Sequence, residues 1–350
     1  MKLKPKDKVK TLVRTLILSC LVLFLGVSHG LARIAKTFPE LSKVESLTVK
    51  NGRIFVIEGP TVSIYSLGDY HLIKKFGTMG EGPREFRVDS PDNVLRIDIL
   101  PGYIVVNSIR KVSYYTLDGE FVKEKAAPFN AKYFQPLGEN YVGELKILEG
   151  DITYKIFNLF NPVFEKIKEV SRQKHIVQKA KNKFVVGKEV TKCQVFNDKI
   201  FISGKEGFAF DIYDKNGNLF RTFKQPYEKR KLTNEDQKEI HELLKKEYGM
   251  DNYEIFKSWI EFAPDFPVIG DFLSDGQYVY VSTNKEKEGK MELFMFDAEG
   301  KFLKNIFLPV AKKDPFRPFP YDFYKGKLYQ LIENQETEMW QLHINPVTGS

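Results

Sequence analysis

The sequence predicts an all-β fold, a six-bladed β-propeller built from four-stranded antiparallel blades. The first observation is an internal repeat of a turn, an apolar run, a gap, a second strand, a hairpin turn and a third strand. The second is a further apolar segment before most copies, at 94–100, 190–196 and 268–273, which raises the unit to four strands. The third is a period of about 40 to 50 residues where no insertion intervenes, which is typical of propeller blades.

The repeat occurs six times along the chain, at residues 51–77, 101–128, 139–170, 197–226, 275–309 and 325–346. Each copy opens with a turn containing Gly, Asn or Asp, which tolerate positive φ angles. The run that follows is rich in Ile, Val, Tyr and Phe, which suit a buried strand. A β-sandwich or two small barrels is the alternative, but such folds rarely repeat a turn signature in phase.

The last copy is one strand short, because it ends at Asn345-Pro346. The segment Arg33–Phe38 (RIAKTF) resembles the outer strand KFLKNIF of the preceding copy. We therefore expect it to supply the outer strand of the last blade, so that the two ends of the chain close the ring and leave no open edge.

The first 32 residues have the composition of a targeting segment. Six Lys and Arg residues and one Asp precede or flank an apolar run at 15–27, which is short for a transmembrane helix. Small residues at 28–32 offer a cleavage site, so residues 1–32 are predicted to be a signal peptide and 33–350 the propeller. The protein is then exported, to a periplasm or the extracellular space; a retained anchor or a lipid on Cys20 is the alternative.

Removal of the signal changes both the charge and the cysteine count. The full chain carries +8, of which the signal holds +5, so the mature part carries only +3, and we expect no nucleic-acid partner. Cys193 would then be alone and form no intramolecular disulfide. Its apolar neighbours predict a small buried side chain.

The segment 76–86 (FGTMGEGPREF) together with the strands that follow it resembles an NHL repeat. It is similar to the loop of bacterial exported six-bladed propellers that carry the pattern G-x-G-x-G-P-x-E-F. The resemblance covers about one blade, and it implies the propeller fold more than any activity. The loop lacks the following helix and the Lys-Ser/Thr pair of a phosphate-binding loop. We expect its glycines to allow a tight path and Phe86 to wedge between blades.

Long insertions fall between the outer strand of one blade and the inner strand of the next, at 78–91, 171–189, 227–267 and 311–320. Such connections emerge on one face of a propeller, which marks a candidate working face. The longest, between blades 4 and 5, is predicted to hold a helical insertion at about 228–262. Thr233 and Asp236 form a capping-box pattern there, and Gly249 ends the helix. The insertion is either a structural cap or a lid over the central channel.

These loops supply the predicted ligand-binding face, which is basic with apolar anchors. Basic groups beside aromatic rings suit an acidic partner. The predicted residues are Arg84, Arg87, Lys174, Lys179, Lys181, Lys183, Trp259, Lys312, Lys313, Phe316 and Arg317. The leading hypothesis is a monomeric, non-enzymatic binding or scaffold module for a protein, peptide or glycan. Membrane association is expected only through an uncleaved or lipidated N-terminal segment.

No catalytic constellation stands out in the sequence. His71, His175, His241 and His343 fall in different repeats without a metal-ligand spacing, and no G-x-S-x-G motif is present. No cofactor or metal site is therefore predicted. The competing hypothesis, implied by the family resemblance, is a metal-dependent lyase or a lactonase-type hydrolase with zinc or calcium in the channel.

Overall fold

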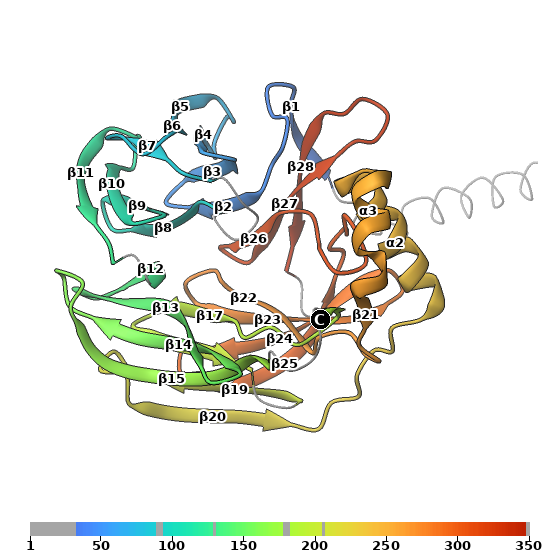
Figure 1. Cartoon of the computed structure of the whole chain (residues 1–350). Helices are drawn as coiled ribbons and strands as arrows, with labels where there is room; N and C mark the ends of the chain where they lie inside the picture. The colour runs from blue at the N-terminus through green and yellow to red at the C-terminus, as the bar shows by residue number, and fades with distance from the viewer. Residues whose placement is uncertain (1–32, 89–93, 129–130, 178–182, 205–206, 348–350) are drawn as a thin grey trace, which may run out of the picture. The chain divides into compact units, whose positions relative to one another are not determined.

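The computed structural model describes residues 33–88, 94–128, 131–177, 183–204 and 207–347, so the predicted signal peptide and Cys20 lie outside the described residues. Six four-stranded antiparallel sheets are arranged as a β-propeller (Figure 1). The predicted fold class and blade number are confirmed.

Each blade runs from its inner to its outer strand in chain order, except the last. Blade 1 contains β2 (Ser46–Lys50), β3 (Arg53–Glu58), β4 (Thr61–Ser66) and β5 (Leu72–Phe76). Blade 2 contains β8 (Arg96–Leu100), β9 (Tyr103–Ser108), β10 (Lys111–Thr116) and β11 (Phe121–Ala126). Blade 3 contains β12 (Ala131–Leu137), β13 (Asn140–Glu149), β14 (Ile152–Phe160) and β15 (Lys166–Val177).

The second half of the ring follows the same pattern. Blade 4 contains β17 (Cys193–Phe196), β18 (Lys199–Ser203), β19 (Phe208–Tyr213) and β20 (Leu219–Gln225). Blade 5 contains β22 (Ile269–Ser274), β23 (Tyr278–Lys287), β24 (Lys290–Asp297) and β25 (Phe302–Leu308). Blade 6 contains β26 (Tyr321–Tyr324), β27 (Lys327–Glu333), β28 (Trp340–Pro346) and β1 (Arg33–Phe38).

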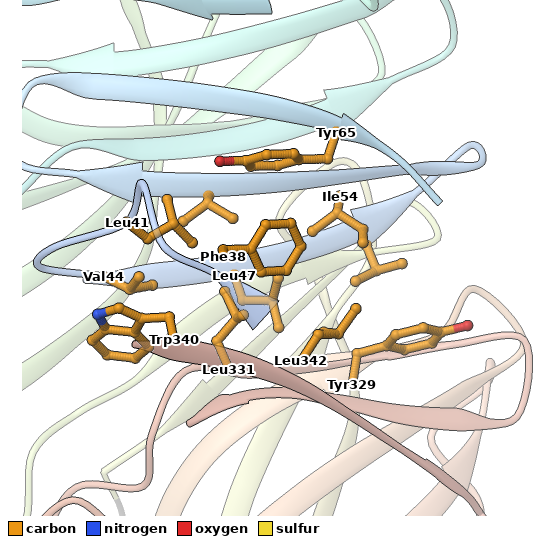
Figure 2. Packing of buried hydrophobic residues seen from close by; sticks show 12 residues of the cluster. Phe38, Leu41, Val44, Leu47, Ile54, Tyr65, Tyr329, Leu331, Trp340 and Leu342 are labelled. Carbon is orange, nitrogen blue, oxygen red and sulfur yellow. The ribbon is translucent and has the colours of Figure 1, made fainter. Parts of the chain in front are cut away.

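The last blade confirms the predicted closure, because β1 pairs with β28 and completes the sheet. Figure 2 shows the apolar cluster at this closure, where blade 6 packs against blade 1. Phe38 and Trp340 are 0% and 1% exposed, and the Trp340 indole donates a hydrogen bond to the Ser42 carbonyl. The two ends of the propeller are therefore held by a strand pairing and by a buried core.

Similar clusters fill the other interfaces between blades, with aromatic rings in most of them. Between blades 4 and 5, for example, the rings of Phe208 and Phe294 lie 4.3 Å apart. Phe86 is fully buried between blades 1 and 2, edge-on to Tyr115, as the wedge prediction requires. Gly77 is needed beside it, because its φ is +90° and a Cβ would lie 2.8 Å from the Phe86 ring.

One predicted loop is wrong in extent. The segment 171–189 was expected to be an insertion, but β15 continues to Val177, which pairs with Ile152 on β14. The hairpin of β13 and β14 is longer than in other blades, because its register holds from Tyr141–Phe160 to Glu149–Ile152. The outer strand has a longer partner and extends with it, so Arg172 and Lys174 lie on a strand.

The helical insertion between blades 4 and 5 is confirmed, with one helix more than expected. α2 (Asn234–Tyr248) begins with the predicted capping box of Thr233 and Asp236 and ends at Gly249. A second helix, α3 (Met250–Phe256), follows at once, and then the 3-10 helix η1 (Lys257–Trp259). Four short strands complete the described elements: β6 (Thr78–Met79) with β7 (Glu85–Phe86), and β16 (Phe184–Val186) with β21 (Ile260–Phe262).

Candidate functional site: the loop face and the inner ring

The strand order gives the propeller two distinct faces. The connections between blades and the turns between the second and third strands emerge on one face, here called the loop face. The turns between first and second strands, and between third and fourth, emerge on the opposite face, and most of them are tight. The insertions therefore share one face, as predicted from the repeat.

Three of the long connections join into one structure, here called the cap, which comprises residues 183–189, 227–268 and 311–320. β16 in the first connection pairs with β21 in the second. Phe316 in the third connection packs against Phe266 in the second, with ring centroids 4.8 Å apart. Arg317 reaches α2 and forms an ion pair with Glu247 at 2.6 Å. The cap is thus held by a strand pairing, an aromatic contact and an ion pair.

The cap exposes large apolar side chains within a short stretch. Tyr248, Met250, Ile255 and Trp259 are 48%, 58%, 67% and 48% exposed. The opposite side of the same stretch is anchored, since Tyr253 is buried and its hydroxyl bonds His241 Nδ1 at 2.8 Å. The exposed side chains therefore belong to an ordered surface.

Most predicted cations of the basic face that the structure describes have carboxylates as neighbours. The ion pairs are Arg87 with Glu81, Lys183 with Glu261, Lys312 with Glu286, and Arg317 with both Asp314 and Glu247. Two of these pairs join different connections of the cap, because Glu247 and Glu261 belong to the helical insertion, whereas Arg317 and Lys183 belong to the other two connections. Much of the charge of this set is therefore compensated within the molecule.

The remaining predicted residues are spread over several elements. Lys174 is exposed on β15, and Lys313 is exposed in the third connection of the cap. Arg84 lies with its guanidinium carbon 5.0 Å from the centre of the Phe121 ring. Lys179 and Lys181 lie outside the described residues. Trp259 and Phe316 do lie in the cap, one exposed and one packed.

The innermost strands form the second candidate site, here called the inner ring: β2, β8, β12, β17, β22 and β26. Contacts run from β2 to β26, and on through β22, β17 and β12 to β8. Each inner strand has one edge that is unpaired within its own blade. At two junctions, a side chain of the neighbouring inner strand accepts a hydrogen bond from an N–H on this edge.

Two junctions of the inner ring use the same device at the same register. Asp322, third from the end of β26, accepts a hydrogen bond from Val49 N–H of β2 at 2.8 Å. Gln135, third from the end of β12, accepts one from Val195 N–H of β17 at 2.9 Å and donates to the Cys193 carbonyl at 3.0 Å. Val49 and Val195 are each second from the end of their strands. We call this contact the edge clasp.

Asp98 occupies the same position on β8, but it has no clasp. The residue second from the end of the next inner strand is Pro136, whose nitrogen carries no hydrogen. Within the described chain, the only hydrogen-bond donor near its carboxylate is Asn107 Nδ2 at 3.4 Å. Burial raises the pKa of Asp98 to about 6, against the opposing charges of Arg96 and Lys50. Burial likewise raises the pKa of Asp322 to about 7.

Arg96, whose charge acts on Asp98, also acts on a second set of polar groups. The Arg96 guanidinium lies over the Tyr133 ring, 3.8 Å from its centre. In blade 3, Lys155 on β14 forms an ion pair with Glu144 on β13 at 2.9 Å, and burial lowers the pKa of Lys155. Cys193 lies beside this pair, partly buried, and burial raises the pKa of its thiol. The sequence predicted a buried side chain, whereas Cys193 is only partly buried.

The histidines lie on different elements of the fold. His71 is exposed beside Asp69, His175 lies on β15, and His241 lies on α2. Both ring nitrogens of His343, on β28, are buried without a hydrogen-bond partner, and burial lowers its pKa. No group of three or more His, Cys, Asp or Glu residues that could hold a metal occurs among the described residues. None of the described helices has the length and apolar character to span a membrane.

The inner-ring carboxyls were missed by the sequence analysis, although a signal exists. Inner strands aligned on the turn that follows them show a polar residue third from the end in five blades. These residues are Thr48, Asp98, Gln135, Gln194 and Asp322. The edge clasp itself is a contact between strands of different blades, which no local pattern reveals.

Comparison with known proteins supports the fold. No family model matches the chain, and no curated protein matches it significantly. A candidate exported protein from Bacteroides fragilis is similar in structure, with a TM-score of 0.52 and 11% identity over 90% of this chain and 94% of that one. A member of the DUF4221 family from Bacteroides vulgatus matches with a TM-score of 0.45 and 13% identity, over 90% and 98% of the two chains. The β-propeller domain of Cps50 (Swd1) from Myceliophteria thermophila matches with a TM-score of 0.41 and 10% identity, over 89% of this chain and 99% of that one.

Proposed function

We propose that this chain is an exported β-propeller that binds another protein through the cap on its loop face. The observation that carries the proposal is the exposed apolar stretch from Tyr248 to Trp259 on an otherwise anchored helical segment. Contiguous exposed apolar side chains on a soluble domain mark interaction sites. Export is supported by the composition of residues 1–32 and by the structural similarity to a candidate exported protein.

The chemistry of the stretch favours a protein over a glycan. Trp, Tyr and Met are enriched at the centres of protein interfaces, while Met250 and Ile255 offer nothing to sugar hydroxyls. Polar groups lie beside these apolar side chains, and Lys257 forms an ion pair with Glu254 within the same stretch. An apolar centre with a polar rim is the usual anatomy of a protein interface. The predicted basic residues would then steer the encounter more than hold the complex.

The family assignment is part of the same proposal. The NHL-like loop has a structural role that fits the resemblance: Glu85 accepts a hydrogen bond from Gly82 N–H at 2.8 Å, and Lys111 donates to the Gly82 carbonyl at 2.7 Å. The first contact lies within the loop, and the second anchors the loop to β10 of blade 2. We infer an NHL-like propeller with a binding role.

A photo-crosslinking amino acid at Ile255, introduced in producing cells, tests the proposal. Leu219 on the outer strand of blade 4 is 59% exposed and provides the matched control position. We expect one discrete protein adduct at Ile255, none at Leu219, and loss of the adduct in Trp259→Ala. Because Trp259 is half exposed, that variant should change stability by only about 0.5 kcal/mol.

Three outcomes would contradict the proposal: no adduct at Ile255, the same adducts at both positions, or an adduct that persists without Trp259. An adduct with a second copy of this chain would assign the surface to self-association and overturn the proposed partner. Binding of a glycan probe that is lost in Trp259→Ala would overturn the protein assignment.

A further inference from the structure

The methionines in the described part of the chain divide into two groups by exposure. Met291 and Met295 lie in the apolar core between blades 5 and 6 and are 4% and 8% exposed. Met79, Met250 and Met339 are 55%, 58% and 39% exposed. An oxidant in solution therefore reaches the sulfur atoms of the second group in the folded protein, whereas the core shields those of the first.

Met250 differs from the other exposed methionines in its position. It is the first residue of α3 and belongs to the exposed apolar stretch from Tyr248 to Trp259. Met79 lies on β6, in the connection between blades 1 and 2, and Met339 lies in the turn between β27 and β28. Of these three side chains, only Met250 belongs to the stretch on which the proposed function rests.

Oxidation would change the character of this surface. When hydrogen peroxide oxidises a thioether, an S–O bond forms, the O–O bond breaks, and the other oxygen leaves as water. The sulfur is oxidised and the peroxide is reduced, and an apolar side chain becomes a polar one. We propose that Met250 is a methionine oxidation site, and that its sulfoxide weakens the binding of the protein partner to the cap. This inference rests on the proposed function.

Two features direct oxidation to methionine rather than to cysteine. Cys193 is the one cysteine among the described residues, and it is partly buried. Burial raises the pKa of its thiol and so lowers the fraction of thiolate, which is the reactive form. A thioether needs no deprotonation to react, and an exported protein meets a more oxidising environment than a cytosolic one.

Peroxide treatment of the folded mature chain that carries the photo-crosslinking amino acid at Ile255 tests the site. Mass spectrometry should find sulfoxide at Met250 and Met79 and none at Met291. The treated chain is then added, below saturation, to an extract of the producing cells. Its Ile255 adduct should fall about tenfold, the effect of losing one buried apolar contact. A methionine sulfoxide reductase should restore it.

Two variants show which sulfur is responsible, and in each the treated chain is compared with the untreated chain. Met250→Leu has no sulfur at this position, so peroxide should leave the yield of its adduct unchanged. Met79→Leu is the matched control, because Met79 is about as exposed as Met250 but lies in another connection. Its adduct should fall on treatment as the wild-type adduct does.

The possible failures separate this proposal from the proposed function. The oxidation site is wrong if Met250 gains no sulfoxide, if the adduct survives treatment, or if the adduct falls equally in Met250→Leu. Each of these results leaves the protein interface in place. Absence of the adduct in the untreated chain would overturn the interface and, with it, the regulation by Met250.

Discussion

Two junctions of the inner ring carry an aspartate at the same register, and they differ in what that aspartate binds. At the closure from blade 6 to blade 1, Asp322 accepts hydrogen bonds from Val49 N–H and Phe323 N–H, both at 2.8 Å. At the junction from blade 2 to blade 3, Asp98 faces a strand whose matching residue is Pro136. The two sites thus differ in one backbone atom: Val49 has an N–H that Asp322 binds, whereas the nitrogen of Pro136 has no hydrogen for Asp98 to bind.

The comparison shows that two junctions between repeated blades can differ in hydrogen bonding while the fold of the blades stays the same. The closure must be secure because the first and last strands of the propeller meet there, and it combines the edge clasp with the apolar cluster of Figure 2. The junction of blades 2 and 3 lies within a continuous chain, so it can lose a clasp without opening the ring. We therefore expect variants at the two junctions to behave differently.

The largest expected effect is at the closure. Phe38→Ala removes a fully buried ring from the strand that completes blade 6, and should lower the free energy of unfolding by about 3–5 kcal/mol. Denaturant unfolding measures it. Ile34→Ala on the same strand is the control, because Ile34 is half exposed and should cost far less. Equal effects of the two variants would mean that β1 does not close the ring.

The next effect is a dependence of stability on pH. The pKa values of Asp98 and Asp322 are raised to about 6 and about 7, so the folded state binds these protons more tightly than the unfolded state. Their stabilising contribution is complete below about pH 4, the ordinary pKa of Asp, and is lost as the pH rises through 6 and 7. For each carboxyl, a tenfold difference in proton affinity between the folded and unfolded states corresponds to about 1.4 kcal/mol of stability.

Variants isolate the two contributions. Asp98→Asn should remove a slope that runs from about pH 4 to about pH 6, and Asp322→Asn a slope that runs from about pH 4 to about pH 7. Each variant must be compared with wild type, because His343 adds a pH dependence of its own to all three proteins. Its pKa is lowered, so it contributes stability that is lost as the pH falls. Urea unfolding of the three proteins between about pH 4 and pH 8 measures these slopes. Parallel curves for all three would show that neither carboxyl titrates in this range.

A smaller effect is expected from the clasp of blades 3 and 4. Gln135→Ala removes two hydrogen bonds across the junction and should cost about 1–2 kcal/mol. Gln194→Ala is the matched control, since Gln194 has the same register in blade 4 and makes no such bond in the described structure. If Gln194→Ala shifts the urea midpoint as much as Gln135→Ala does, the clasp does not contribute to stability.

Much of the fold was predictable because its signals are local. Turns with Gly and alternating apolar runs gave six blades, and the missing strand after Asn345-Pro346 predicted the role of Arg33–Phe38. The extension of β15 was not predictable, because it depends on the length of its neighbour β14. α3 was missed because Gly249, a good helix end, is also where a second helix begins.

The candidate site was less predictable. Exposed cations in loops suggest a basic face, but their partners come from distant segments, as with Arg317 and Glu247. The exposure of Ile255 and the burial of Tyr253 depend on how the cap packs. The difference between Asp98 and Asp322 depends on register between blades, which becomes visible only when Pro136 is placed opposite Asp98.

The measurement that tests the central claim most directly is a carbon NMR titration of the Asp98 and Asp322 carboxyls in wild type and in Pro136→Ala. In wild type both should titrate well above the ordinary value for Asp, with a pKa of about 6 for Asp98 and about 7 for Asp322. In Pro136→Ala the returned N–H should stabilise the charged form of Asp98 and lower its pKa, while that of Asp322 stays unchanged. An Asp98 pKa that is the same in both proteins would contradict the account.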